Sequence, residues 1–265
     1  MKNVIISGGT DGMGRATALR RLERGDAVTV IGSSEAKGRA LVDHAANPNL
    51  RFLRADLSSV AEVERVVRQV SELHESVDAL ALFANRVNAK RIETPDGLES
   101  TFALYYLSRY LLGHRLRPLL DASPAPVVIN VAGVGTTAGR IHWDDPQLTS
   151  NYGQVRAQLQ AGRANDLLGV AFSGRARYVL YHPGFTRSGL DGHENPLVRG
   201  ALRLLGRVFA RPVEEAVRPI VEWIDIPPGA PLTAVDRGKP VPLSLKTLDP
   251  DDAARLAAYT QTLVR

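Results

Sequence analysis

The stretch Val4-Ile5-Ile6-Ser7-Gly8-Gly9-Thr10-Asp11-Gly12-Met13-Gly14-Arg15 decides how this sequence folds. Its apolar start predicts a buried strand, and the spacing of apolar residues that follows predicts a helix over residues 14–24, ending at Gly25. Glycine at positions 8, 12 and 14 allows a tight turn in which backbone N–H groups at the helix start approach a pyrophosphate. The stretch therefore predicts a dinucleotide-binding turn between a strand and a helix.

Strands and helices continue to alternate along the chain. Further β-branched or apolar runs that predict strands lie at residues 27–31, 51–54, 79–83 and 127–131. After the third strand, Ser59 and Glu62 have the spacing of a capping box that opens an amphipathic helix. Because no linker interrupts the alternation, we expect an α/β fold in one domain over residues 1–265. This fold is a Rossmann-type doubly wound parallel sheet of about seven strands with helices on both faces.

Composition limits the classes of function. The 265 residues are 44% hydrophobic and 23% charged, which is typical of soluble globular proteins. The absence of cysteine excludes disulfides and thiolate metal sites, and we expect no metal. The net charge of +5 is spread along the chain, so we expect no nucleic-acid partner. No apolar run is long enough for a membrane span, and Met1-Lys2-Asn3 leads directly into a strand, so we expect a cytoplasmic protein.

The residues after the second strand bear on which nicotinamide cofactor binds. An acidic residue there would bond the ribose 2′-hydroxyl and repel a 2′-phosphate. The sequence instead has Gly32-Ser33-Ser34-Glu35-Ala36-Lys37. Ser33 and Ser34 can donate to a phosphate, and Arg15 and Lys37 supply cations nearby, so this pattern favours NADP(H) over NAD(H).

The glycine spacing after Ser7 resembles that of the short-chain dehydrogenase/reductase family. Residues 94–102 and His182-Pro183-Gly184 resemble its retinol-dehydrogenase-like and WW-domain-oxidoreductase-like members. The resemblance implies an oxidoreductase with a nicotinamide cofactor, paired into a homodimer or homotetramer through residues 97–116 and 151–172. The cofactor-binding residues expected from motif and resemblance are Gly8, Thr10, Asp11, Gly12, Met13, Gly14, Arg15, Ser33, Ser34, Asp56, Leu57, Ala84, Asn85, Pro183, Gly184 and Thr186. Asp56 and Leu57 have the alternative role of capping the next helix.

The resemblance fails at the family's catalytic residues. In the family a tyrosine donates the proton, a lysine four residues later lowers the pKa of that tyrosine, a serine orients the carbonyl, and an asparagine supports a proton relay. The match through Ala157, Gln160, Ala164 and Asn165 puts Gln158 at the tyrosine and Gly162 at the lysine. The positions of the serine and the asparagine are Gly133 and Tyr105. All four catalytic positions are therefore predicted to be substituted.

A second register keeps a tyrosine and a cation. In it Tyr152 is the acid and Arg156, four residues later, is its activating cation, but the match around Ala164-Asn165 is then lost. In the favoured register Gln158 can hydrogen-bond a carbonyl but cannot deliver a proton. The catalytic candidates are Tyr152, Gln158 and Tyr105. Other replacement acids are Tyr106, Asp166 and His182, whose ordinary roles would be helix packing, a charge on a helix surface and a strand end.

Three classes of function follow. The first is a divergent NADP(H)-binding oxidoreductase that acts on a small lipophilic or activated carbonyl or imine substrate without the usual Ser-Tyr-Lys machinery. The second is a non-redox enzyme, such as a cyclase, isomerase or lyase, on the same scaffold. The third is a non-catalytic protein that binds a nucleotide or a partner. Residues 183–211, with an amphipathic helix near residues 197–209, form a candidate substrate lid.

Overall fold

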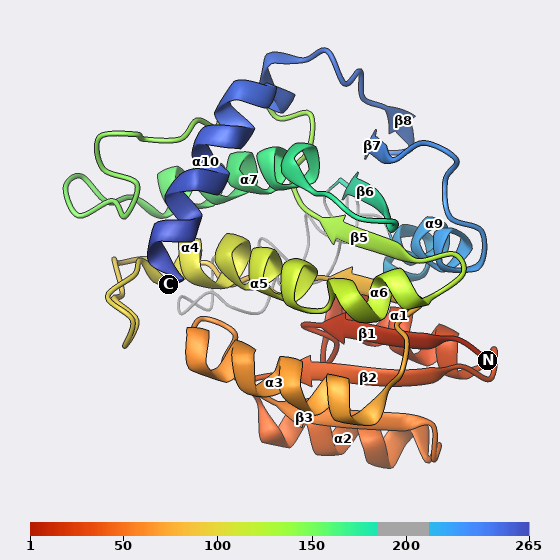
Figure 1. The fold of residues 1–265 in the computed structure, drawn as a ribbon. Helices are drawn as coiled ribbons and strands as arrows, with labels where there is room; N and C mark the ends of the chain where they lie inside the picture. Colours follow the sequence, from red (N-terminus) through yellow and green to blue (C-terminus); the bar gives the residue numbers. More distant parts are fainter. Residues whose placement is uncertain (185–211, 265) are drawn as a thin grey trace.

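A single sheet runs through the molecule. The structure, a computed structural model, describes residues 1–184 and 212–264 (Figure 1). The sheet has eight strands in the order β3-β2-β1-β4-β5-β6-β7-β8. The strands are β1 (Asn3–Ser7), β2 (Ala27–Gly32), β3 (Leu50–Arg54), β4 (Ala79–Leu82), β5 (Val127–Val131), β6 (Arg177–His182), β7 (Leu232–Asp236) and β8 (Lys239–Pro240). The strands from β3 to β7 pair in parallel, and only the two-residue β8 runs antiparallel to its neighbour β7. This confirms the predicted parallel sheet, with one short strand added.

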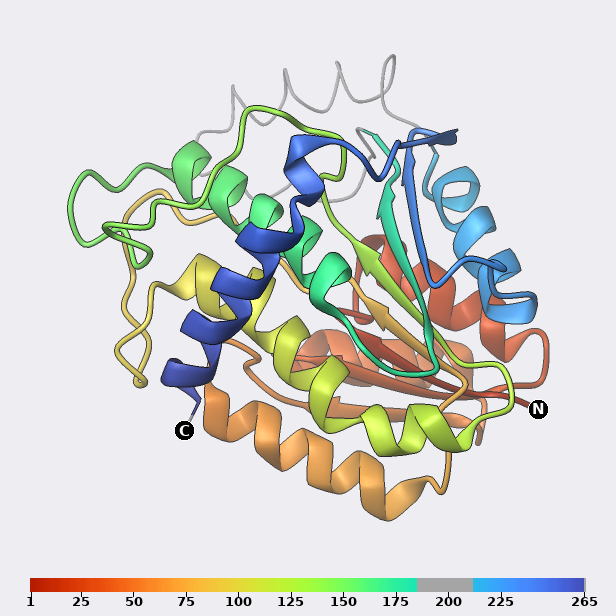
Figure 2. The ribbon, with the colours of Figure 1, turned by 45° about the horizontal axis from the view of Figure 1, so that its top comes forward.

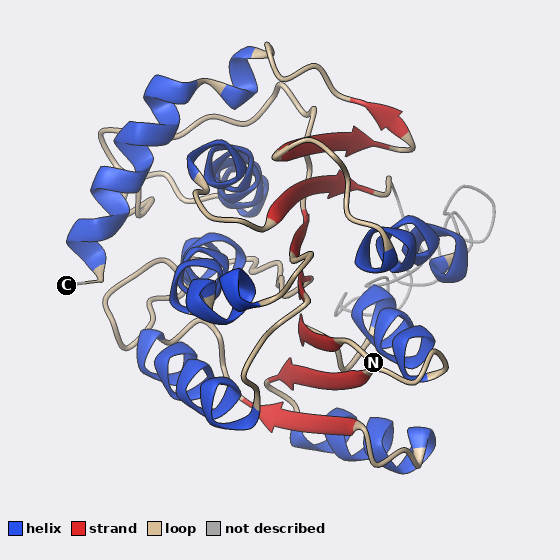
Figure 3. Ribbon diagram, turned by 45° about the vertical axis from the view of Figure 1, so that its right-hand side comes forward, coloured by secondary structure: helices blue, strands red, loops and turns tan. Residues whose placement is uncertain are grey.

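Helices cover both faces of the sheet, as Figure 3 shows. One face carries α1 (Gly12–Leu22), α2 (Glu35–Ala45) and α9 (Val213–Asp225). The other face carries α3 (Val60–Leu73), α4 (Ser100–Phe102), the π-helical turn η1 (Ala103–Leu107), α5 (Ser108–Arg115), α6 (Arg117–Ala122), α7 (Gln154–Ala171) and α10 (Pro250–Leu263). A short 3₁₀ turn, η3 (Lys246–Leu248), precedes α10. The doubly wound architecture is confirmed.

The strands read as continuous apolar runs because both faces of the sheet are buried. In β1, Val4 and Ile6 pack with α1 and α9, whereas Ile5 between them packs with the helices of the other face. All three side chains are fully buried. Successive side chains of a strand point to opposite faces of the sheet. Because helices cover both faces of this parallel sheet, successive positions of the strand are apolar.

The helix after β3 begins differently from the prediction. Ser59 makes no side-chain capping bond, and Glu62 pairs with Arg65 at 2.7 Å instead of reaching back to the helix start. The Oδ2 atom of Asp96 accepts a hydrogen bond from the backbone N–H of Val60 at 3.0 Å. The predicted capping box is therefore wrong, because a carboxylate from a distant loop occupies this helix start.

The end of the chain covers α7. Both η3 and α10 pack against α7, and Figures 1 and 2 show α10 lying across it. Asp166 on α7 is only 1% exposed. The prediction that Asp166 is a surface charge is therefore wrong.

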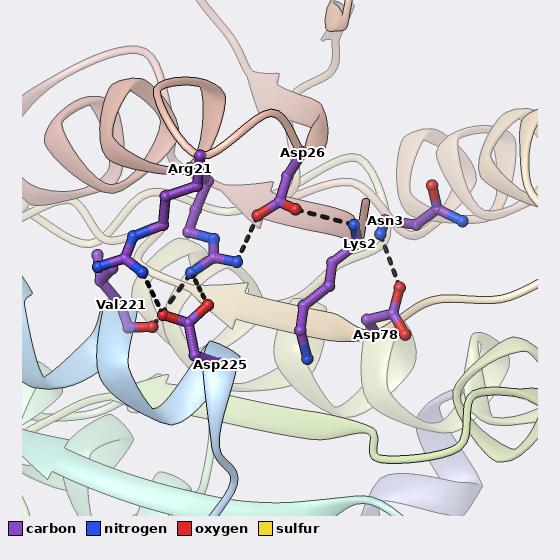
Figure 4. Close-up of polar contacts among 8 residues, drawn as sticks. Lys2, Asn3, Arg21, Asp26, Asp78, Val221 and Asp225 are labelled. Atoms are coloured by element: carbon purple, nitrogen blue, oxygen red, sulfur yellow. Dashed lines mark hydrogen bonds and ion pairs between the residues drawn. The ribbon is translucent and has the colours of Figure 1, made fainter.

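A buried ion cluster fastens α1 to α9, as Figure 4 shows. It lies near the amino ends of β1 and β2, whereas the glycine turn lies at the carboxyl end of β1. Arg21 on α1 is 2% exposed and pairs with Asp26, and its Nη1 atom lies 2.6 Å from Asp225 Oδ1 on α9. The same nitrogen donates to the carbonyl oxygen of Val221. Helices that are distant in the sequence are thus held together by charge as well as by apolar packing.

Parts of the sequence prediction lie outside the described residues. They are most of the candidate lid at 183–211, its expected helix at 197–209, and the expected cofactor residue Thr186. Within the described ranges, no helix is long and apolar enough to cross a membrane.

Candidate functional site

The glycine turn lies at the carboxyl end of β1, between β2 and β4. Gly8 has φ of +70°, and its N–H donates to the carbonyl oxygen of Ile31 at 2.8 Å, which ties the turn to β2. A Cβ atom at Gly8 would lie 2.7 Å from the backbone nitrogen of Ala84. A Cβ atom at Gly14 would lie 2.3 Å from the carbonyl oxygen of Gly8. The chain therefore approaches itself too closely for any side chain at these two positions.

This turn lies at the point in the sheet where the strand order reverses. From β1 the chain continues to β2 and β3 on one side and later to β4 and β5 on the other. In open α/β sheets, ligands bind outside the carboxyl ends of the strands at such a point. The start of α1 points into this region and has no acidic residue in its first turn. The cradle therefore fits the pyrophosphate of a dinucleotide.

Asp11 caps α1 rather than leaving its charge free. Its Oδ1 atom accepts from the N–H of Gly12 at 2.7 Å, and its Oδ2 atom pairs with Lys37 Nζ at 2.5 Å. The hydrogen bond from Lys37, helped by the Gly12 N–H and the charges of Lys37 and Arg15, lowers the pKa of Asp11 despite partial burial. The carboxylate beside the cradle is thus balanced by a cation.

The end of β2 is built around small residues. A Cβ atom at Gly32 would lie 2.8 Å from the Cγ2 atom of Thr10, so the Thr10 side chain occupies the space that a side chain at position 32 would need. Ser34 caps α2 by accepting from the N–H of Lys37 at 3.3 Å. The Oγ atom of Ser33 lies 3.4 Å from Nη2 of Arg86, which comes from the loop after β4. Arg86 is thus a further cation beside Ser33.

Asp56 and Leu57, after β3, both have local roles. Asp56 Oδ1 accepts from the backbone N–H and the hydroxyl of Ser58 at 3.0 and 2.7 Å. Leu57 is 4% exposed and belongs to the core beneath α3. The geometry accounts for both residues as a turn before α3, and a contact of either with adenine stays a prediction.

Gln158, from the first turns of α7, reaches the loop after β4. Asn85 Nδ2 donates to Gln158 Oε1 at 2.9 Å, and Gln158 Nε2 donates to Asn85 Oδ1 at 3.2 Å and to the carbonyl oxygen of Arg86 at 2.9 Å. Gln158 therefore holds this loop with both ends of its amide.

Tyr152 precedes α7 and binds the same loop further along. Its hydroxyl donates to the carbonyl oxygen of Asn88 at 2.8 Å. Burial raises the pKa of Tyr152. Arg156, its partner in the second register, is exposed on α7, and no contact between the two is among the described hydrogen bonds or ion pairs. The hydroxyl of Tyr152 is engaged in fixing a loop.

Tyr105 and Arg109 lie deeper, where the helix after α4 contains the π-helical turn. Tyr105 packs with Ala132, after β5, and with Ala161 on α7, and the Arg109 guanidinium carbon lies 4.6 Å from the centre of its ring. Burial and the charge of Asp166 raise the pKa of Tyr105, although the charge of Arg109 and the Gly133 backbone oppose this.

The glycines at the expected serine and lysine positions leave room. A Cβ atom at Gly162 would meet no atom within 4 Å, and one at Gly133 would come only within 3.6 Å of Thr136 Oγ1. Neither glycine has a positive φ. These two positions therefore tolerate side chains, in contrast to Gly8 and Gly14.

His182 ends β6 beside the residues expected to back the nicotinamide. Its Nδ1 atom lies 2.8 Å from Asp236 Oδ1 on β7, and Arg237 also binds Asp236. The next residues are Pro183 and then Gly184, which has φ of +84°. The pair of His182 and Asp236 joins the ends of two neighbouring strands.

A family model described as "short chain dehydrogenase" matches residues 2–144, which is more than half of the chain and includes the glycine turn and β1 to β5. The chain belongs to the short-chain dehydrogenase family.

Relatives of this short-chain dehydrogenase place it near the retinol-dehydrogenase-like branch. Mouse retinol dehydrogenase 13 is 29% identical over 202 residues, which cover 72% of this chain and 60% of the mouse protein's own length. A solved structure of an uncharacterized protein from Mycobacterium paratuberculosis has a TM-score of 0.76 and 22% identity, with 100% of this chain and 93% of the other covered. The complex of Pseudomonas aeruginosa RhlG with NADP has a TM-score of 0.68 and 20% identity, with 89% and 95% covered. The two structures confirm the fold.

Sequence and structure differ in how much of the site they locate. The fold brings the glycine turn, Ser33 and Asn85 together at the carboxyl ends of β1, β2 and β4, as the motifs predict. The sequence reasoning missed Arg86 and Arg109. A signal for Arg109 exists, because Tyr105 and Arg109 are four residues apart, the same spacing as the tyrosine and lysine of the family. The roles of all these residues toward cofactor and substrate stay predictions.

Proposed function

We propose that this short-chain dehydrogenase is an NADP(H)-dependent oxidoreductase that reduces a lipophilic or activated carbonyl or imine without the usual Ser-Tyr-Lys set. The observation that carries the proposal is the glycine turn, where contacts at Gly8 and Gly14 leave no room for a side chain. The first turn of α1 has no acidic residue, and its capping residue Asp11 is paired with Lys37. Gly8, Thr10, Gly12, Met13, Gly14 and Arg15 would hold the pyrophosphate end, and Ala84, Asn85, Pro183 and Gly184 the nicotinamide end. A bound dihydronicotinamide supplies hydride to an electrophilic carbon.

The preference for NADP(H) is supported by the charges near Ser33. No acidic side chain follows β2 directly, and the Arg86 guanidinium lies 3.4 Å from the Ser33 hydroxyl. Lys37 and Arg15 are further cations on the same side of the cradle, although Lys37 is shared with Asp11. A 2′-phosphate beside Ser33 would gain charge-assisted hydrogen bonds that a 2′-hydroxyl would not.

Binding of the reduced cofactors, followed by their fluorescence, tests this preference. NADPH should bind at least about tenfold more tightly than NADH, and Arg86→Gln should weaken NADPH binding about tenfold while leaving NADH binding unchanged. Arg39→Gln is the matched control, because Arg39 is 75% exposed on α2 and, among the described residues, pairs only with Glu35. Equal binding of the two cofactors by the wild-type protein would contradict the NADP(H) preference.

A lipophilic substrate is supported by exposed apolar side chains around Gln158. Val155 lies in the first turn of α7, three residues before Gln158, and is 63% exposed. Val87 lies in the loop that Gln158 and Tyr152 hold, and is 60% exposed. The mouse relative is a retinol dehydrogenase, and retinol is a lipophilic alcohol. We therefore expect the substrate to present an apolar body and one reducible group.

The replacement of the family's catalytic serine, tyrosine and lysine supports an activated substrate. Gly133 and Gly162, aligned with the family's serine and lysine, carry no side chain, and Gln158, aligned with its tyrosine, does not titrate. A standard ketone needs a proton as well as a hydride, whereas an iminium ion needs only the hydride. Nearby backbone groups would orient the substrate, and Gln158 would do so by exchanging a bond to Asn85 or Arg86 for one to the substrate.

Turnover is tested by oxidation of NADPH with three probes: a vicinal aromatic diketone, an apolar cyclic ketone and a cyclic N-alkyl iminium salt. We expect oxidation of NADPH in step with product. Product without NADPH oxidation would favour a cyclase, isomerase or lyase. Tight NADPH binding with no turnover of any probe would favour a nucleotide-binding protein without catalysis.

The assembly and location expected from the sequence stay predictions. Pairing through residues 97–116 and 151–172 would need a face that α10 covers, because α10 packs against α7 (Figure 2). A homodimer or homotetramer would therefore use a different surface unless α10 moves. A cytoplasmic location also stays a prediction.

A further inference from the structure

The π-helical turn η1 and the first turn of α5 place Tyr105 and Arg109 beside the carboxyl end of β5. The N–H of Ser108 bonds the carbonyl oxygen of Ala103, five residues back, so the helix widens at Tyr105. Such widened turns occur often at functional sites. Tyr105 and Arg109 are four residues apart and lie on the same side of this helix, with the guanidinium stacked on the ring at 4.6 Å.

Arg109 is a buried cation held in one position. Its Nη1 atom donates to Asn130 Oδ1 and, at 2.9 Å, to the carbonyl oxygen of Val131, both at the end of β5. Its Nη2 atom donates to the carbonyl oxygen of Ala84, after β4, at 3.0 Å. Arg109 is 1% exposed, and none of the described ion pairs gives it a carboxylate partner. Its charge therefore favours the ionised forms of Tyr105, on whose ring it stacks, and of Tyr178, whereas the charge of Asp166 disfavours the ionised form of Tyr105.

The Tyr105 hydroxyl lies beside Gly133, the residue aligned with the family's serine. Tyr105 packs against Ala132, the residue before Gly133, and is 8% exposed. The other candidate groups are engaged elsewhere. The Gln158 amide is bonded to Asn85 and Arg86, and the Tyr152 hydroxyl to Asn88. Of the three catalytic candidates, Tyr105 alone combines a titratable hydroxyl with an adjacent buried cation.

We infer that Tyr105 is the proton donor of this enzyme and that Arg109 is the positioning residue that stabilises its phenolate. The inference rests on the proposed oxidoreductase function. The substrate's carbonyl carbon gains a C–H bond with the hydride of NADPH, which is oxidised to NADP⁺. The C=O double bond becomes a single bond, and the oxygen takes the proton from the Tyr105 hydroxyl. The phenolate regains a proton from water. The pair Tyr105-x-x-x-Arg109 thus replaces a tyrosine and lysine pair from a different helix.

The first test separates proton donation from structural support. Tyr105→Phe keeps the ring that stacks on Arg109 and removes only the hydroxyl. Reduction of the apolar cyclic ketone should fall about hundredfold or more, because general acid catalysis typically contributes about 10²–10⁴-fold. Reduction of the iminium salt should stay within about threefold, since that reaction takes up no proton. Tyr110→Phe is the matched control, because Tyr110 lies on the same helix and stacks on His114, away from Gly133.

The second test needs no turnover. Ultraviolet absorbance of tyrosinate is followed against pH in the wild-type protein and in Tyr105→Phe, and the difference is the titration of Tyr105. Arg109→Gln should move this titration about one to three pH units higher, because an opposite charge at this distance favours the ionised form. Arg109→Lys keeps the charge and should restore most of the shift. Should Arg109→Gln not fold, the ketone and iminium rates of Tyr105→Phe still decide the matter.

Each outcome has one meaning. Equal losses for ketone and iminium in Tyr105→Phe, or no loss for either, overturn the assignment of the proton donor and leave the proposed oxidoreductase intact. A wild-type protein that reduces only the iminium salt also overturns it, because no proton donor then operates. A wild-type protein that oxidises NADPH with none of the probes overturns the proposed function, and this inference with it. An unmoved Tyr105 titration in Arg109→Gln overturns the role of Arg109.

Discussion

Asp166→Asn should gain stability relative to the wild type as the pH rises from 5 to 8. Asp166 lies on α7 and is 1% exposed. Its Oδ1 atom has no hydrogen-bond partner among the described residues. Burial raises the pKa of Asp166 to about 7, although the charge of Arg163 opposes this. Asparagine has the shape of the protonated acid but cannot ionise.

The magnitude follows from the difference between folded and unfolded chains. The ordinary pKa of an aspartate is 3.8, so the shift to about 7 is about three units, or about 4 kcal/mol. Between these two values the folded state holds a proton that the unfolded state has lost, so stability falls as pH rises. Below about pH 4 and above about pH 7 the contribution is level. Between pH 5 and pH 8 the wild type should lose about 3 kcal/mol relative to Asp166→Asn.

Urea denaturation at pH 5 and pH 8 measures the change. At each pH the unfolding free energy of the wild type is subtracted from that of the variant, and the two differences are then compared. An effect of the amide that does not depend on pH cancels in this comparison. Asp43→Asn is the control, because Asp43 is exposed on α2 and its difference should be the same at both pH values. A difference for Asp166→Asn that does not change with pH would refute the reasoning that burial sets its pKa.

Three further changes test other contacts. Arg21→Met should lower the free energy of unfolding in urea by about 3–5 kcal/mol because Asp26 is left buried without its cation, whereas Arg20→Met, at an exposed pair, should change it by less than about 0.5 kcal/mol. Similar losses of unfolding free energy in both variants would contradict the reasoning that the buried ion pair matters more than the exposed one. Gly14→Ala should weaken NADPH binding by fluorescence at least about tenfold, since its Cβ atom would lie 2.3 Å from a backbone oxygen; unchanged affinity would argue against the cradle. Asp96→Ala should cost about 1 kcal/mol in thermal or urea unfolding and Ser59→Ala almost nothing, and the reverse order would restore the predicted capping box.

Local patterns were enough to predict the architecture. The run from Val4 to Arg15 predicts a strand, a tight turn and a helix from residues that are neighbours in the chain, and the structure has β1 and α1 in those places. Short, continuous apolar runs that alternate with helices then predict the parallel sheet, because a strand buried on both faces is apolar at successive positions. The absence of an acid after β2 is likewise a property of neighbouring residues.

The local pattern was less informative where a distant segment supplies the partner. Ser59 has the spacing of a cap, but Asp96, from another loop, takes the helix start. Gln158 has an amide that suits a substrate carbonyl, but the loop after β4 occupies that amide.

By itself, the sequence determined that this chain forms a doubly wound sheet with a glycine cradle, because close backbone contacts and apolar periodicity are encoded within short stretches. It also indicated that the family's usual catalytic side chains are replaced. Only the tertiary structure decided what lies around those positions. The π-helical turn brings Tyr105 to Gly133 and stacks Arg109 on it, and α10 and η3 cover the helix that carries Asp166. Except for the stacking of Arg109 on Tyr105, these contacts join residues that are far apart in the chain, and burial shifts the pKa values of Tyr105, Arg109 and Asp166. Spacing along a sequence does not encode burial of that kind.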